Sequence, residues 1–592
     1  MIDHNKQEET QQYQGFILDL MVGRLVNIEF QIILTSDNKA LYIKDGAVIR
    51  VDQLHSTQKQ AEVLKNLEQI QHLQLDGQFG ENNQKIGRWS TIWKGETLKN
   101  VGGQYSNDGK KNGQWKELIR NFWSEAQVYE MGEYENNYKK GVWKSINCEK
   151  EIGYGEYNKQ GQRIGIWIEL SDRFWNYSQI TYKGEYLNDK KIGKWDIYFK
   201  KTFQDYQNDE IGGGLYDDDQ QKEGVDVKIG KWIELSDWFW YLSQVTYHGE
   251  YKNDKKVGRW NTMWKKAYGD YMNEQIGGGQ YDQGNQYGDT SIKIGEWIEL
   301  TDSFWGDSQV IYKGEYQNGK KIGKWEILWR MYDKKPFQLI GGGQYDEDEK
   351  NERESVKTGN WIELNNGFYN RSQVIYNGEY KNGKKVGRWN ILWREEDSDQ
   401  QFQVIGGGSY DDQIGSLKIG KWIELSDGFM DNSQVIYIGE YQNGNKIGFW
   451  DINWIYNGIN QQIGGGLYDD GKEGRLGLKI GKWVELSYDY REGSQITYTG
   501  EYQNGKKIGI WDCYWIQNES NQKIGGGSYD HDCQKQGGER VKNGKWVEIS
   551  EKFNKWSQII YDGEYKYGKK IGIWNKINLK EDSIIDELKY DN

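Results

Sequence analysis

The sequence predicts an all-β fold: an elongated, single-layer antiparallel β-meander of hairpin repeats with a small mixed cap at its N-terminus. The segment Ser308 to Trp325, SQVIYKGEYQNGKKIGKW, recurs in near-copies along most of the 592 residues. The chain has 29 Trp and 43 Tyr although only 36% of its residues are hydrophobic, which fits a thin aromatic-faced sheet better than a large globular core. One proline and 75 glycines suit strands joined by tight turns.

The recurring segment is expected to be a β-hairpin. Asn318-Gly319 favours a two-residue type I′ turn, because both residues tolerate the positive φ that this turn needs. Pairing outward from the turn sets Tyr316 opposite Lys321, Gly314 opposite Gly323, Tyr312 opposite Trp325, and Val310 opposite Ile327. In this register the ring of Trp325 covers the gap at Gly314, and such cover stabilises a strand that contains glycine.

The region before the repeats is expected to form a cap over the first exposed sheet edge. Residues 1–13 are polar and predicted to be disordered, and residues 14–72 are predicted to hold short strands and one helix. Alternation from Val26 to Ile32 predicts a strand, and Asp45-Gly46 predicts a second hairpin that continues to Val51. The helix is expected to be capped by Ser56 or Thr57 and to carry Ala61, Leu64, Leu67 and Ile70.

The repeat array is expected to span residues 73–577, followed by an acidic C-terminal tail at 578–592. Nine A units end in G-x-W, and eight B units have a glycine run followed by G-x-W-x-E. Each A–B pair supplies four strands, so about 34 strands give a path on the order of 160 Å before twist and bending. The structural tryptophans of these units include Trp195, Trp232, Trp260, Trp297, Trp325, Trp361, Trp389, Trp422, Trp450, Trp483, Trp511 and Trp546.

The motif Y-x-G-E-Y-x-N-G-K-K-x-G-x-W, as in Tyr312 to Trp325, resembles the MORN repeat, in particular its variants that end in G-x-W. The resemblance covers residues 73–577. It departs from the usual pattern in two ways, because a Trp replaces the last glycine of the G-x-G ending and the B units carry long insertions. It implies an elongated β-ribbon that acts in assembly, in organising partners, or at membranes.

Charge and cysteine content limit the partners and the compartment. The net charge is −13 and the isoelectric point about 5.3, so we expect no nucleic-acid partner. Cys148, Cys513 and Cys533 form neither a disulfide framework nor a zinc motif, which favours a reducing compartment. The N-terminus lacks a signal-peptide pattern, and charged residues interrupt Phe16 to Leu34. We therefore predict a cytoplasmic protein, with cytoskeletal or membrane association left open.

Recurring polar residues argue for structure rather than for catalysis. One glutamate occupies the same slot in every B unit, whereas a catalytic carboxylate is needed once, so we expect a ladder paired with lysines or backbone donors. The glycine runs, such as Gly341 to Gly343, are read as strands because no helix follows to form a phosphate site. Histidines follow no ligand pattern, and the acidic loops leave a weak calcium site open. We expect no enzyme activity, no cofactor and no metal site. The B-unit glutamates are Glu117, Glu169, Glu234, Glu299, Glu363, Glu424, Glu485 and Glu548.

The lysine pairs of the A turns, such as Lys320-Lys321, are the best candidates for binding an anionic surface. Strand counting places the acidic loops, such as Asp217 to Asp219, on the same edge of the sheet. Basic turns and acidic loops then alternate within about a Debye length, which cancels much of the positive field.

The turns at the opposite edge read S-D-x-F-x. Their phenylalanine column recurs to the end of the chain and is read as packing, whereas the next residue changes from aromatic to Met430, Arg491 and Asn554. A row confined to the first five turns favours a partner-binding surface, with neutral drift as the alternative. Neighbouring rings are expected about 19 Å apart, which is four strand spacings. The candidate partner-binding residues are Trp123, Trp175, Trp240, Trp305 and Tyr369.

Together these features favour a non-enzymatic repeat scaffold that mediates protein–protein interaction or assembly, cytoskeletal or membrane-associated as the MORN-like resemblance implies. One alternative is a module that stacks a carbohydrate or another flat ligand on the edge aromatics. Another is a peripheral protein that binds anionic lipid, with weak association to a membrane surface.

Overall fold

The structure is a computed structural model. It describes residues 9–19, 23–35, 37–53, 63–201, 208–218, 225–266, 273–283, 291–331, 335–346, 355–396, 401–456, 458–470, 477–488, 490–517, 520–530 and 541–590. Within these residues the chain forms a four-stranded N-terminal sheet, one helix and one long antiparallel sheet.

The N-terminal sheet has the order β1-β2-β3-β4, with β1 Glu9–Asp19, β2 Arg24–Leu34, β3 Lys39–Lys44 and β4 Ala47–Gln53. It confirms the predicted strand from Val26 to Ile32 and the hairpin at Asp45-Gly46. Because β1 begins at Glu9, the prediction that residues 9–13 are disordered is wrong. Helix α1, Leu67–His72, begins after its N-cap Asn66 and leads into the array. The predicted caps Ser56 and Thr57 lie outside the described residues, as does Ala61.

The long sheet contains 35 strands in chain order. Its first half consists of β5 Leu73–Phe79, β6 Lys85–Trp93, β7 Glu96–Tyr105, β8 Lys111–Leu118, β9 Val128–Glu135, β10 Tyr138–Asn147, β11 Lys150–Tyr157, β12 Arg163–Leu170, β13 Gln179–Leu187, β14 Lys190–Lys200, β15 Asp209–Tyr216, β16 Lys228–Leu235, β17 Gln244–Lys252, β18 Lys255–Lys265, β19 Asn273–Tyr281, β20 Lys293–Leu300 and β21 Gln309–Gln317. Its second half consists of β22 Lys320–Arg330, β23 Gln338–Tyr345, β24 Lys357–Leu364, β25 Gln373–Lys381, β26 Lys384–Arg394, β27 Gln403–Tyr410, β28 Lys418–Leu425, β29 Val435–Gln442, β30 Asn445–Tyr456, β31 Ile459–Tyr468, β32 Lys479–Leu486, β33 Ile496–Gln503, β34 Lys506–Gln517, β35 Ser520–Tyr529, β36 Lys542–Ile549, β37 Ile559–Lys566, β38 Lys569–Asn578 and β39 Ser583–Tyr590.

Every neighbour in this sheet is antiparallel, so the predicted all-β meander is confirmed. The predicted acidic tail is instead the last strand, β39, which pairs with β38. Leu588 and Tyr590, two residues apart on one face of β39, pack against the last aromatic cluster, and the net acidity of the segment hid this spacing.

The predicted turn is confirmed, since Asn318 and Gly319 have φ of 50° and 79°. The predicted register holds only beside the turn, because the observed pairs are Tyr316 with Lys321, Tyr312 with Ile327, and Val310 with Trp329. A bulge opposite Gly314 moves the register by two residues. The ring of Trp325 does cover Gly314, as predicted, and a Cβ at this glycine would lie 2.4 Å from that ring.

All twelve predicted structural tryptophans are buried, and each lies over a glycine of the preceding strand. Tyrosines alternate with them in edge-to-face contact: Trp325 lies 5.3 Å from Tyr316 and 6.1 Å from Tyr345. Such pairs follow one another from Phe79 to Trp511 and again from Tyr529 to Tyr590, and Tyr529 packs against the cluster that contains Trp511, so the core of the array is an aromatic ladder.

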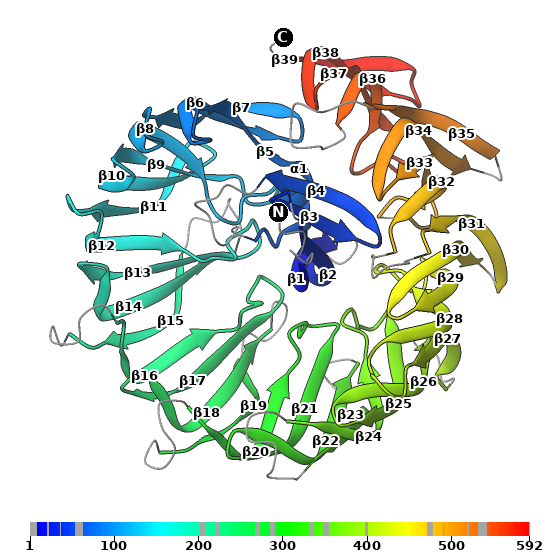
Figure 1. Cartoon of the computed structure of the whole chain (residues 1–592). Helices are drawn as coiled ribbons and strands as arrows, with labels where there is room; N and C mark the ends of the chain where they lie inside the picture. Colours follow the sequence, from blue (N-terminus) through cyan, green and yellow to red (C-terminus); the bar gives the residue numbers. More distant parts are fainter. Residues whose placement is uncertain are drawn as a thin grey trace, which may run out of the picture.

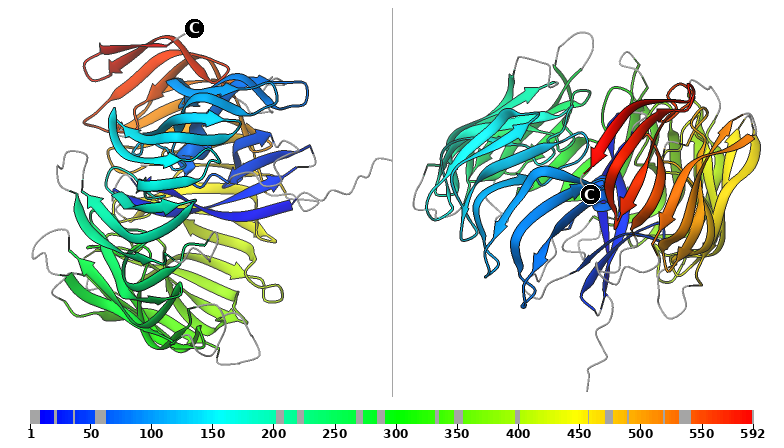
Figure 2. Two further views of the ribbon diagram at one scale, coloured as in Figure 1. Left: turned by 90° about the vertical axis from the view of Figure 1, so that its left-hand side faces the viewer. Right: turned by 90° about the horizontal axis from the view of Figure 1, so that it is seen from above.

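The sheet bends into a ring around the N-terminal sheet, a curvature that the sequence analysis did not predict (Figures 1 and 2). No paired residues of the described chain join β39 to β5, so the ring closes through other contacts. The backbone N–H of Lys570 donates to the carbonyl of Gly95 at 2.8 Å, and the hydroxyl of Tyr590 donates to Glu96 at 2.7 Å. We call these contacts the seam.

The N-terminal sheet and α1 hold both ends of the ring. Glu68 of α1 accepts a hydrogen bond at 3.2 Å from the backbone N–H of Ser124, which lies in the connection between β8 and β9. Lys94, beside the seam, forms ion pairs with Glu68 at 2.7 Å and with Glu551, which lies in the connection between β36 and β37. Within the described residues, no helix combines the length and apolarity needed to cross a membrane.

Candidate functional site

The predicted aromatic row lies at the centre of the ring and is buried. Trp123, Trp175, Trp240, Trp305 and Tyr369 are 2–9% exposed. Successive ring centroids lie 5.9, 6.1, 6.3 and 6.4 Å apart, so the predicted spacing of about 19 Å is wrong. The prediction that the row is an exposed surface is also wrong, because each ring packs against the next.

The close spacing arises because the S-D-x-F-x turns bond directly to one another around the ring. The buried hydroxyl of Ser308 donates to the carbonyl of Phe368 in the next turn at 2.6 Å. The backbone N–H of Asn370 donates to the carbonyl of Asp307 at 3.0 Å. We call this series the inner spine. The serine that opens each S-Q segment carries it, a role that sequence reasoning missed although the residue recurs. Its hydroxyl bonds join Ser178 to Phe239, Ser243 to Phe304, Ser372 to Phe429, Ser433 to Tyr490, and Ser494 to Phe553.

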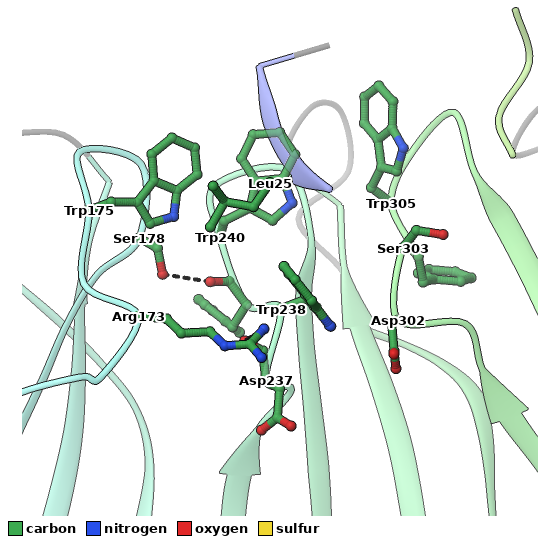
Figure 3. A pocket seen from close by; sticks show the side chains of 12 residues that line it. Leu25, Arg173, Trp175, Ser178, Asp237, Trp238, Trp240, Asp302, Ser303 and Trp305 are labelled. Carbon is green, nitrogen blue, oxygen red and sulfur yellow. Dashed lines mark hydrogen bonds between the residues drawn. The ribbon is translucent and has the colours of Figure 1, made fainter. Parts of the chain in front are cut away.

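The aromatic row contacts a segment of the same chain. Leu18 and Leu25 of the β1–β2 hairpin pack against it. Figure 3 shows Leu25 beside Trp240, with Asp237 and Asp302 extending away from the row. The cavity at this place is only about 30 Å³, room for a water molecule and not for a ligand.

The B-unit glutamates form the predicted ladder with lysines. Glu299 pairs with Lys321 at 2.8 Å and also with Lys293, and it accepts a hydrogen bond from the hydroxyl of Tyr316 at 2.8 Å. The Lys321 ammonium also lies 4.0 Å from the ring of Trp325. The second lysine of the A turn is therefore engaged within the sheet, which weakens the case for an anionic surface. The same pairing recurs at Glu169, Glu234, Glu363, Glu424, Glu485 and Glu548.

The glutamate ladder makes stability depend on pH. Burial raises the pKa of Glu299, but the charges of Lys321 and Lys293 outweigh burial and lower it overall from 4.5. A carboxyl with a lowered folded-state pKa stabilises the fold above its unfolded value, and this contribution is lost as pH falls below about 4.5. Replacement of Glu299 by Gln should cost about 2 kcal/mol at pH 7. In urea unfolding followed from pH 7 to pH 3, this deficit should shrink as the wild type loses the same contribution.

The matched control is Glu326→Gln. Glu326 pairs with Lys324 at 2.9 Å on the exposed side of β22. An exposed pair contributes little, so this variant should lose less than about 1 kcal/mol at any pH. Equal losses from both variants would show that the buried ladder adds nothing beyond ordinary surface pairs.

The lysine turns and the acidic loops lie together, as predicted. The backbone N–H of Lys191 donates to Asp226 at 2.7 Å, and that of Gly193 donates to Asp218 at 2.7 Å. At the seam the carbonyl of Gly95 caps the N–H of Lys570 in the same way. Residues 219–224 of this loop, which include Asp219, lie outside the described residues.

A groove between successive repeat pairs holds the turn of the β3–β4 hairpin. The Lys44 ammonium binds Asp427 at 2.9 Å, and the hydroxyl of Tyr468 donates to the carbonyl of Asp45 at 3.1 Å. The backbone N–H of Lys479 donates to the carbonyl of Gly46 at 2.9 Å. The array therefore binds a β-hairpin of its own chain by specific polar contacts. Sequence reasoning placed this hairpin in a cap but gave no sign of where it docks.

The equivalent groove between β16 and β20 is open. It is a cavity of about 220 Å³ lined by Glu234, Asp237, Tyr247, Lys256 and Asp302, among others. Trp238 also lines this cavity, and the guanidinium of Arg173 lies 4.0 Å from the centroid of the Trp238 ring.

Among the described residues, no three His, Cys, Asp or Glu side chains gather as metal ligands. His72 packs edge-on against Trp93, and burial lowers its pKa to about 3. His248 lies 2.8 Å from the hydroxyl of Thr246 in β17. These placements give neither histidine a catalytic partner.

No protein-family model matches the chain, and no curated protein matches it. The MORN-like resemblance therefore rests on the sequence motifs alone.

Proposed function

We propose that the protein is a non-enzymatic ring scaffold that binds protein partners in the grooves between its repeat pairs. The observation that carries this proposal is the β3–β4 turn, which occupies one groove while the equivalent groove at Asp237 is a cavity of about 220 Å³. A surface that binds extended protein structure through backbone groups and matched charges suits a protein ligand better than a small molecule.

Burial of the aromatic row removes the stacking faces on which the carbohydrate alternative depended. The free thiols of Cys148 and Cys513 support a reducing compartment such as the cytoplasm.

The test is site-specific photo-crosslinking in the cells that make the protein. A photoreactive residue at Trp238, at the mouth of the open groove, should yield covalent adducts with a partner protein. The control is the same residue at Lys324, which is 67% exposed and lies on the opposite side of the sheet from Trp325. Adducts at the control alone, or at neither position, would contradict the proposed function.

A further inference from the structure

We propose that the groove at Asp237 and its neighbour at Asp302 bind a β-turn of the form Lys–acidic–Gly on a partner protein. This inference rests on the proposed function and specifies the ligand and the two sites.

Four groups hold the internal turn Lys44-Asp45-Gly46. Three are those described above: the Asp427 carboxylate, the Tyr468 hydroxyl and the Lys479 backbone N–H. The fourth is the Gly505 carbonyl, which accepts from the backbone N–H of Val48 at 2.8 Å. Lys446 lowers the pKa of Asp45 after the larger effect of Lys44, so the acidic residue of the turn lies in a positive environment.

The repeat register identifies the equivalent groups in the other grooves. The groove at Asp237 has Tyr281, Lys293 and Gly319 in these places, and the groove at Asp302 has Tyr345, Lys357 and Gly383. Lys446, the lysine whose charge acts on Asp45, corresponds to Lys256 and Lys321 in the two open grooves. Each of these lysines forms an ion pair with its B-unit glutamate.

These two grooves keep the required groups unengaged. No described residue forms an ion pair with the carboxylate of Asp237 or Asp302, or accepts from the backbone N–H of Lys293 or Lys357. Burial and then repulsion from Asp237 raise the pKa of Asp302 by more than the charge of Arg173 lowers it.

Three other grooves each lack one of the groups. In the preceding groove, the carboxylate of Asp254 accepts from the N–H of Lys228 at 3.3 Å, which removes the donor for a turn carbonyl. Two further grooves lack the carboxylate that corresponds to Asp427. Asn366 stands in its place in the groove after Asp302, and Tyr488 in the groove after the occupied one. Among these grooves of the described chain, those at Asp237 and Asp302 therefore keep the full set of groups open.

The probe is a cyclic peptide with the sequence from Lys39 to Gln53, closed end to end so that its hairpin is preformed. Fluorescence polarisation would measure its binding to the full chain. Replacement of both acceptors, Asp237→Asn with Asp302→Asn, should weaken binding on the order of tenfold or more, because a charge-assisted contact is lost in each groove. A peptide with Lys44→Glu should lose binding to a similar extent.

The matched control is Asp172→Asn, an equally exposed aspartate in the groove whose donor is already capped by Asp254. It should leave peptide affinity unchanged, and all variants should melt as the wild type does. Absence of binding at millimolar peptide, or equal binding to the double variant, would overturn the turn specificity. If the peptide test fails but the Trp238 adducts form, the proposed scaffold function still holds. If neither peptide binding nor Trp238 adducts are found, both the turn specificity and the scaffold function are contradicted.

Discussion

Replacement of Trp325 by Ala should destabilise the middle of the ring by about 3–5 kcal/mol, because it empties a large space that the sheet cannot fill by local collapse. Trp325 is 1% exposed, touches Tyr316 and Tyr345 edge to face, and covers Gly314. Each repeat contacts mainly its neighbours, so the loss should remain local. Native-state hydrogen exchange should show reduced protection in β21 to β24 and unchanged protection in β9 to β12.

The matched control for this variant is Trp556→Ala. Trp556 is 77% exposed, so its removal should change stability by less than about 0.5 kcal/mol. A uniform loss of protection over the whole array in Trp325→Ala would show that the ring unfolds as one unit, contrary to this expectation.

Replacement of Gly342 by Ala should cost about 3 kcal/mol or more, since it combines a backbone strain with a direct clash. Gly342 has a φ of 124°, and a Cβ there would lie 2.1 Å from the carbonyl oxygen of Trp325 on the preceding strand, β22. Relief requires β22 and β23 to separate. Thermal unfolding and exchange at these two strands would measure the effect.

The matched control is Gly306→Ala, because a Cβ at Gly306 meets nothing within 4 Å and its φ is not in the left-handed region. It should be close to neutral. Comparable stability of the two variants would mean that the strands accommodate a methyl group at Gly342 without separating.

The glycine runs show what the sequence could reveal. Their interpretation as strands is confirmed, and the three residues of one run have different neighbours. Gly341 faces the carbonyl of Ile362, Gly342 faces Trp325, and Gly343 lies under Trp361. The motif itself predicted the cover of glycine by tryptophan, because that contact lies between neighbouring strands and follows from local alternation.

The curvature of the sheet could not be predicted in the same way. It depends on the inner spine, in which Ser308 reaches the carbonyl of Phe368, 60 residues later. Strand counting assumed a flat sheet and therefore spread Trp240 and Trp305 about 19 Å apart, although their ring centroids lie 6.3 Å apart. The register beyond the turn could not be predicted either, since the two extra residues of β22 opposite Gly314 leave no mark in the alternation beside the turn.

Sequence reasoning missed the open groove at Asp237, because the groove can be recognised only from the β3–β4 turn that occupies the equivalent groove at Asp427. Neither Asp237 nor Lys293 stands out in the sequence, since each repeats a pattern found in other units. Only the contact of Gly46 with Lys479, between residues more than 400 positions apart, shows what these groups can bind.

The seam also constrains how this gene can evolve. In an open solenoid each repeat contacts only its neighbours, so an added unit only lengthens the array. Here the N–H of Lys570 must meet Gly95, and Tyr590 must meet Glu96, after one turn around the centre. An extra A–B pair would carry β38 past β7 and leave both contacts unmade. We therefore expect the number of repeat pairs to be fixed by closure of the ring, and related chains to differ in loop length more than in repeat count.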